Sequence, residues 1–134
     1  MYQICRIYRD ILIISKNNGG PKMIEEKKNM LSAALLWAWG ENMKAESRDV
    51  SSDMLVAYKD GLKTTFITEF DKSKEKLIEC IAKIKSDFIY ILTNDNGKRR
   101  ELIEIIPDYC GILFYGNPFG LGNLYMVLKE PQQI

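Results

Sequence analysis

The chain of 134 residues carries 46% hydrophobic residues, which suits one domain with its own core. Its net charge of +1 means that any surface for nucleic acid must be a local patch rather than a global basic field. The absence of histidine excludes imidazole catalysis and imidazole metal ligands, and three scattered cysteines favour buried thiols in a reducing, cytoplasmic compartment.

The first segment, residues 1 to 22, is predicted to be a dispensable appendage, in the form of an added strand or short helix. Its apolar residues are interrupted by Arg6, Arg9 and Asp10, so we expect no membrane span. No small-residue cleavage site follows, so we expect no signal peptide. A break in the chain is expected at Asn17-Asn-Gly-Gly-Pro21. Residues 23 to 134 are then predicted to form a single domain.

Residues 24 to 42 are predicted to form an amphipathic helix. Apolar residues recur at helical spacing, among them Met30, Ala34 and Trp37. The aromatic residues of this helix are better explained as core residues than as platforms for stacking bases. A polar stretch over residues 43 to 52 follows the helix.

A hairpin is predicted next, with strands over residues 54 to 58 and 62 to 70. Both stretches are rich in β-branched and aromatic residues, and Lys59-Asp60-Gly61 supplies the turn. Gly61 adopts positive φ without a clash, which suits a three-residue loop ending in a bulge. A two-residue loop of Asp60 and Gly61 is the alternative.

The length of this loop decides which carboxylates share a face of the sheet. The three-residue loop places Asp53 on the same face as Glu69 and Asp71, whereas the two-residue loop places Asp53 on the opposite face from Glu69. Carboxylates gathered beside an apolar hairpin repel one another and lose solvation, so the first arrangement requires a cation. Oxygen ligands of this kind suit Mg²⁺ or Mn²⁺.

A second amphipathic helix is predicted over residues 72 to 85. Asp71 or Ser73 can cap its N-terminus, which is the structural alternative to a metal role for Asp71. Three lysines crowd the first turns beside the carboxylates, where they suit phosphate contact or form a solvated face: Lys72, Lys74 and Lys76.

The remaining chain completes an α/β pattern. A buried strand is predicted over residues 88 to 93, a short helix over 98 to 106, and strands over 111 to 115 and 124 to 129. The order helix, hairpin, helix, strand, helix, strand, strand predicts a mixed β-sheet flanked by helices.

These residues carry a resemblance to a known family. An aspartate before a hairpin, followed by Glu-x-Lys and a helix, is the core of the PD-(D/E)XK nuclease superfamily, and residues 24 to 129 resemble that core. Asp53 takes the first acidic position and Glu69 the second. The chain departs from the motif because Asp71 stands at the position of the lysine, with Lys72 one residue later.

The resemblance implies a restriction-endonuclease-like αβββαβ core and a Mg²⁺- or Mn²⁺-dependent nuclease that hydrolyses DNA in repair, recombination or replication. It is closest to small repair and resolvase-like members. It implies that Asp53 and Glu69 hold the metal, which polarises the scissile phosphate and activates a water molecule. Asp71, which departs from the motif, is expected to act as a further metal ligand. It also implies that Lys72 orients this water, with Lys74 or Lys76 as a substitute reaching from the helix.

In this family an acidic residue on the first helix often joins the metal site. Glu41 is the nearest candidate by position and Glu46 the next, although a solvated helix end is the better explanation for each of them. DNA is the expected partner, no membrane is expected, and the resemblance leaves a homodimer open.

Two other interpretations remain at this point. One is a nuclease fold that has lost catalysis and binds nucleic acid or a protein partner, which Asp71 at the lysine position favours. The other is an unrelated small α/β protein in which Asp53 and Glu69 are ordinary residues at strand ends.

Overall fold

The computed structural model describes residues 19–51, 53–117, 120 and 122–132. Residues 1 to 18 of the predicted appendage lie outside these ranges, whereas residues 19 to 22 belong to helix α2, Gly19–Gly40. The chain break expected at Pro21 is therefore wrong. Proline is tolerated in the first turn of a helix, where the N–H that it lacks would have no helical partner.

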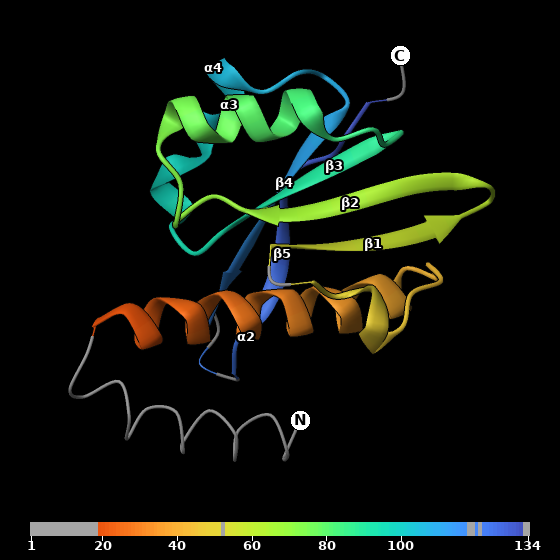
Figure 1. Ribbon diagram of the computed structural model, residues 1–134, viewed down its shortest axis with the longest axis horizontal. Coiled ribbons are helices and arrows are strands. Elements are labelled where there is room, and N and C mark those ends of the chain that lie inside the picture. The colour runs from red at the N-terminus through yellow and green to blue at the C-terminus, as the bar shows by residue number, and fades with distance from the viewer. Residues whose placement is uncertain (1–18, 52, 118–119, 121, 133–134) are drawn as a thin grey trace.

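A five-stranded mixed sheet forms the centre of the molecule (Figure 1). Its strands lie in chain order: β1 Met54–Lys59, β2 Leu62–Thr68, β3 Phe88–Thr93, β4 Cys110–Gly116 and β5 Leu124–Lys129. The central pairs β2–β3 and β3–β4 are parallel, and the outer pairs β1–β2 and β4–β5 are antiparallel. The predicted α/β class with a mixed sheet is confirmed.

Helices cover both faces of this sheet (Figure 1). Helix α2 lies on one face, and α3, Lys74–Lys83, and α4, Arg99–Ile105, lie on the other. Two short 3-10 helices complete the described chain, η1 at Ser47–Asp49 and η2 at Asn96–Lys98. No helix among the described residues is long and apolar enough to cross a membrane.

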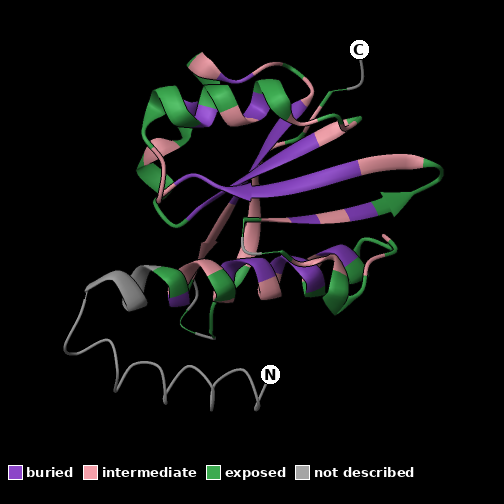
Figure 2. Ribbon diagram, viewed as in Figure 1, coloured by how far each residue is buried: buried purple, intermediate pink, exposed green. Residues whose placement is uncertain are grey.

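The sheet separates two hydrophobic cores, and its middle strands are buried along most of their length (Figure 2). On the α2 side, Met30, Leu31 and Ala34 pack against Leu55 and Phe66. On the opposite side, helices α3 and α4 bury the core residues Leu77, Ile81, Leu102 and Ile106 against the sheet. Burial on both faces explains why β3 is an almost continuous apolar run.

The hairpin between β1 and β2 has a two-residue turn. Lys59 pairs with Leu62, which leaves only Asp60 and Gly61 in the loop, at φ of 53° and 80°. Positive φ at both positions defines the type I′ turn, whose twist matches that of the flanking strands. Aspartate tolerates this left-handed conformation better than most residues with a side chain. The three-residue loop predicted from the sequence is therefore wrong, and the alternative register is correct.

This register turns every side chain of β1 to the other face of the sheet, relative to the expected pairing. Leu55 pairs with Phe66, and both are fully buried on the α2 side. Met54 pairs with Ile67, so the next residue outward, Asp53, lies beside the end of β2 on the α2 side. Glu69 follows on the opposite face from Asp53.

Candidate functional site

Four of the predicted residues lie at one end of the sheet, where the carboxyl ends of β2 and β3 meet the beginning of β1: Asp53, Glu69, Asp71 and Lys72. In open α/β sheets, ligands bind outside the carboxyl ends of the strands. Asp53 is positioned by Ser51, whose Oγ accepts hydrogen bonds from the N–H groups of Asp53 (3.3 Å) and Met54 (3.1 Å). The candidate site therefore lies at the polar ends of β1, β2 and β3, next to the hydrophobic cores on the two faces of the sheet.

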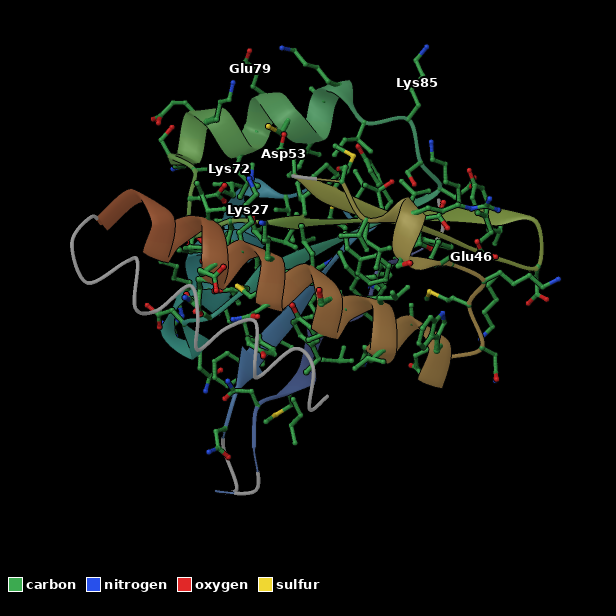
Figure 3. The ribbon with its side chains drawn as sticks, turned by 60° about the horizontal axis from the view of Figure 1, so that its bottom comes forward. Lys27, Glu46, Asp53, Lys72, Glu79 and Lys85 are labelled. Atoms are coloured by element: carbon green, nitrogen blue, oxygen red, sulfur yellow. The ribbon has the colours of Figure 1, made fainter. Side chains whose placement is uncertain are left out.

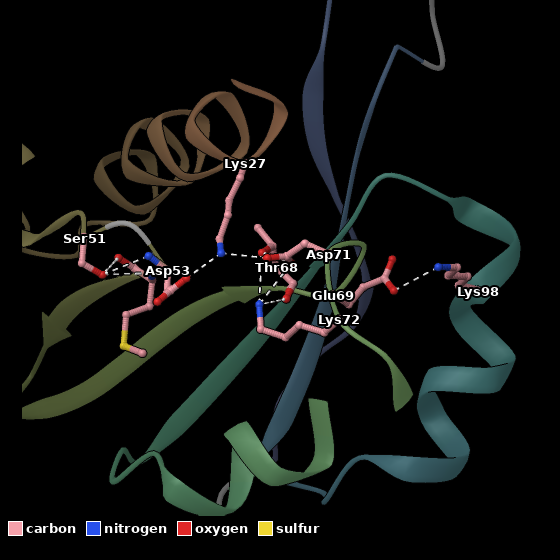
Figure 4. A network of polar contacts seen from close by, with 9 residues as sticks. Lys27, Ser51, Asp53, Thr68, Glu69, Asp71, Lys72 and Lys98 are labelled. Carbon is pink, nitrogen blue, oxygen red and sulfur yellow. Dashed lines mark hydrogen bonds and ion pairs between the residues drawn. The ribbon is translucent and has the colours of Figure 1, made fainter. Parts of the chain in front are cut away.

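Two carboxylates at this edge converge on one ammonium group. Lys27 extends from α2 and places Nζ 2.6 Å from Oδ1 of Asp53 and 2.7 Å from Oδ2 of Asp71 (Figure 4). The side chains differ in exposure, at 64% for Asp53 and 12% for Asp71. The ammonium of Lys27 therefore lies between the largely buried side chain of Asp71 and the exposed side chain of Asp53.

The second oxygen of Asp71 is held by two further donors. Thr68 Oγ donates to Asp71 Oδ1 at 2.7 Å, and Lys72 Nζ lies 3.1 Å from the same oxygen. The Lys72 ammonium also donates to the carbonyl oxygen of Thr68 at 2.8 Å. The backbone N–H of Lys72 donates to the carbonyl oxygen of Glu69, and this hydrogen bond closes a turn after β2. Asp71 is thus fixed with one oxygen bound inside and the other directed at the cation position.

Asp71 does not act as the cap of helix α3. The Ser73 side chain takes that role, because its Oγ accepts a hydrogen bond from the N–H of Lys76 at 3.1 Å. The predicted cap at Ser73 is confirmed, and the explanation of Asp71 as a mere cap is wrong. Its contacts are instead with Lys27, Thr68 and Lys72.

Glu69 lies in a separate contact on the other side of the sheet. Its Oε1 accepts from Thr93 Oγ at 2.8 Å, and its Oε2 lies 3.2 Å from Lys98 Nζ on η2 (Figure 4). The expectation that Glu69 shares a face with Asp53 is wrong because the two-residue turn shifts the register by one residue. Within the described part of the chain, no group of three or more acidic or cysteine side chains is arranged to hold a metal.

The charges in the Lys27 cluster stabilise one another. Burial alone would lower the pKa of Lys27, but its hydrogen bonds to Asp53 and Asp71 outweigh this and raise the pKa. The hydrogen bond from Lys27 lowers the pKa of Asp53. Burial tends to raise the pKa of Asp71, yet hydrogen bonds from Lys27, Thr68 and Lys72 bring it below its ordinary value. All three groups, Lys27, Asp53 and Asp71, are therefore ionised at neutral pH.

The remaining predicted residues lie outside this cluster. Lys74 and Lys76 are exposed in the first turns of α3. Glu41 follows the end of α2, about 21 Å along the helix from Lys27 at the usual rise per residue. Glu46 pairs with Arg48 at 2.8 Å, far from the labelled lysines Lys27 and Lys72 (Figure 3). Neither glutamate supplies the accessory acid expected from the first helix.

The first helix contributes a lysine instead, which the sequence interpretation missed. Lys27 precedes Met30, Leu31 and Ala34 by three, four and seven residues, so it lies on the apolar face of α2. A lysine on that face requires an anionic partner or a route to solvent. This spacing was the available signal, and Asp53 and Asp71 are the partners.

Whether a divalent metal can bind here depends on the carboxylate oxygens that the residues offer. Mg²⁺ binds proteins through one or two carboxylates, completed by water and substrate phosphate. Asp53 Oδ1 and Asp71 Oδ2 already point at one cation position, and the exposure of Asp53 gives access to water. Asp53 and Asp71 therefore direct two carboxylate oxygens at one cation position, which the ammonium of Lys27 occupies, whereas Asp53 and Glu69 lie in separate contacts and do not.

No protein-family model, curated protein or solved structure matches the chain. The resemblance to the PD-(D/E)XK superfamily rests on the quoted residues and the order of elements. The distinctive feature of this end of the sheet is the ion-paired cluster of Lys27, Asp53, Asp71 and Lys72.

Proposed function

We propose that the protein is a divalent-metal-dependent nuclease that acts on DNA, with Asp53 and Asp71 as its metal ligands. The observation that carries this proposal is the convergence of the two carboxylates on one cation position. Of the three ligands expected from the sequence, Asp53 and Asp71 are retained in this proposal and Glu69 is not. When bound, Mg²⁺ or Mn²⁺ would polarise the scissile phosphate and lower the pKa of a water molecule.

The neighbouring residues orient Asp71 for this role. Thr68 and Lys72 bind Oδ1 of Asp71, which leaves Oδ2 directed at the cation position. Lys72 is nearly buried and engaged with Thr68 and Asp71, so it acts as a positioning residue rather than as a group that contacts substrate. Glu69 and Lys98 anchor the adjacent η2 segment to the end of β2.

The exposed lysines of α3 are the proposed contacts to DNA. Lys74 and Lys76 lie at the N-terminal turns of this helix, where phosphate groups are favoured. Because the chain has a net charge of only +1, such binding depends on this local patch. The free thiols of Cys80 and Cys110 suit action in a reducing, cytoplasmic compartment.

Cleavage assays on several DNA forms, with and without Mg²⁺ or Mn²⁺, test the proposal. We expect metal-dependent cleavage by the wild type and a loss of about 100-fold or more in Asp53→Asn and Asp71→Asn, because metal catalysis requires its ligands. Glu69→Gln should retain activity within a few-fold. Absence of cleavage with either metal on every DNA form would contradict the nuclease proposal.

A second candidate is a nuclease-like domain without catalysis that binds DNA. The observation that favours it is the neutralisation of both carboxylates by Lys27, whose side chain is only 15% exposed. In that case the wild type retains DNA in a gel-shift assay, Lys74→Gln and Lys76→Gln weaken the retention, and no metal produces cleavage.

A further inference from the structure

The two outer strands of the sheet differ in how their outer edges are covered. The edge of β1 pairs with the chain that precedes it, because Lys44 and Tyr58 exchange backbone hydrogen bonds of 2.7 and 3.0 Å. On β5, the described chain makes one backbone hydrogen bond outside the ladder to β4, from Arg99 Nε to the carbonyl oxygen of Leu128. Among the described residues, β5 therefore ends the sheet without a further partner strand.

The sequence of β5 leaves this edge open to pairing. Proteins usually protect an unpaired edge with charged side chains, proline or irregular pairing. β5 reads Leu-Tyr-Met-Val-Leu-Lys, and the ammonium of Lys129 donates to carbonyl oxygens of Asp108 (3.3 Å) and Cys110 (2.5 Å), at the beginning of β4. The irregular pairing with β4 is confined to the Lys129 end. The rest of the strand is regular, apolar and half-buried or exposed (Figure 2).

A second copy of β5 is complementary to this edge. In an antiparallel pair, directly opposite side chains lie on the same face of the sheet. A two-fold axis at Met126, perpendicular to the sheet, pairs this residue with itself, Leu124 with Leu128, and Tyr125 with Val127. Alternation along the strand agrees with these pairs, because Tyr125 and Val127 pack on the α2 side and Leu128 on the other. Each apolar side chain thus faces another, and no like charges are opposed.

We infer that the outer edge of β5 binds the same edge of a second copy of this chain. The two five-stranded sheets then join into one sheet of ten strands. Backbone hydrogen bonds across the axis provide affinity, and the apolar pairs on both faces fix the register. Because both copies use the same surface, the assembly closes as a dimer. β5 lies at the opposite edge of the sheet from β1, so this inference is independent of the proposed metal site.

Size-exclusion chromatography with light scattering, run on the full chain over a series of concentrations, tests the inference. We expect a concentration-dependent dimer. Met126→Lys would oppose two ammonium groups at the axis and should weaken dimerisation by about fivefold or more. Met126→Leu should keep the dimer. The matched control is Ile78→Lys, which places the same charge at an exposed apolar position on α3 and should also keep the dimer.

Oxidative crosslinking tests the register and does not depend on whether Met126→Lys folds. Residues directly opposite in an antiparallel pair have Cβ atoms about 4.5–5.5 Å apart, so Met126→Cys should form a disulfide-linked dimer faster than the wild type. The wild-type thiols of Cys5, Cys80 and Cys110 provide the background rate. Leu124→Cys, which faces Leu128 of the second copy, should crosslink more slowly than Met126→Cys.

Three outcomes would overturn the inference. A full chain that stays monomeric at every concentration leaves this edge to another segment or partner. A dimer that persists in folded Met126→Lys, or that is lost equally in Ile78→Lys, does not use β5 in this way. Met126→Cys that crosslinks no faster than the wild type excludes the proposed register. Each outcome is measured without metal or DNA, so the nuclease proposal stands or fails separately.

Discussion

Two carboxylate–lysine contacts lie at the same edge of the sheet, and they differ in almost every physical respect. Glu69 is a closed contact: its side chain is 5% exposed, and its two oxygens are bound by Thr93 and Lys98. Asp53 and Asp71 instead share one lysine, and Asp53 is mostly exposed. The first arrangement engages both oxygens of one carboxylate, whereas in the second one oxygen from each of two carboxylates contacts the same ammonium. The face of the sheet on which a carboxylate lies is therefore a better guide to its contacts than its position in the sequence motif.

Replacing Asp71 by lysine should have the largest effect on stability. The change restores the lysine of the family motif, but it would place a third ammonium beside Lys27 and Lys72 in a half-buried position. We expect a loss of about 4 kcal/mol or more in the free energy of unfolding, measured by urea denaturation, because uncompensated buried charge is strongly destabilising. A stable Asp71→Lys protein with new nuclease activity would show instead that Asp71 is a lesion in a silenced enzyme.

Replacing Glu69 by alanine should lower stability without touching the cation site. The ammonium of Lys98 would lose its acceptor, and the buried hydroxyl of Thr93 would keep only the longer contact to the carbonyl oxygen of Asp95, at a cost of about 2 kcal/mol. Mn²⁺ affinity, measured by calorimetry, should stay within a few-fold of wild type. A large loss of metal affinity in a folded Glu69→Ala protein would show that the two contacts are not independent.

The stabilisation of Asp53 and Asp71 by Lys27 should depend on pH. Their pKa values are lowered in the folded protein, so this contribution is complete above the ordinary carboxyl pKa and is lost as the pH falls through the lowered values. Lys27→Met should therefore be less stable than the wild type by about 2 kcal/mol near neutrality, because Asp53 loses its lysine partner and Asp71 keeps only Thr68 and Lys72. The difference should shrink in acid.

Urea denaturation of both proteins across a pH series measures this difference. Lys28→Met serves as the control for loss of a positive charge from α2, and its difference from wild type should be small at every pH. A difference for Lys27→Met that stays constant down to acid pH would show that packing, rather than charge, is the source of the stabilisation.

Replacing the exposed lysines of α3 should have the smallest effect on the fold. Lys74→Gln and Lys76→Gln should change the free energy of unfolding by less than about 0.5 kcal/mol, as is usual for surface positions. Each should weaken DNA binding a few-fold and reduce the salt dependence by about one phosphate contact. Fluorescence anisotropy at several salt concentrations measures both. Unchanged DNA affinity in both variants would show that Lys74 and Lys76 do not contact DNA.

The architecture was accessible from the sequence because its signals are local. The apolar run of β3, the amphipathic spacing of α3 and the cap at Ser73 each depend on neighbouring residues, and each prediction agrees with the structure. The order of elements then defined the mixed sheet. The start of α2 was placed too late because Gly19, Gly20 and Pro21 were interpreted as a break.

The site was less accessible because it depends on register and on contacts distant in sequence. Both hairpin loops were compatible with Asp60-Gly61, and a change of one residue decided whether Asp53 faces Glu69 or Thr68. The contact between Lys27 and Asp53 spans 26 positions and two elements. The sequence placed Lys27 on the apolar face of α2, but only the packing of α2 on the sheet identifies its partners.

A calorimetric Mn²⁺ titration of the wild type, Asp71→Asn and Glu69→Gln most directly tests the claim that Asp53 and Asp71 form the cation site. These two substitutions remove one negative charge each while keeping nearly the same shape. We predict that the wild type and Glu69→Gln bind one Mn²⁺ with similar affinity and that Asp71→Asn loses the binding. Loss of binding in folded Glu69→Gln with retention in Asp71→Asn would contradict the claim and return the metal site to the position expected from the motif.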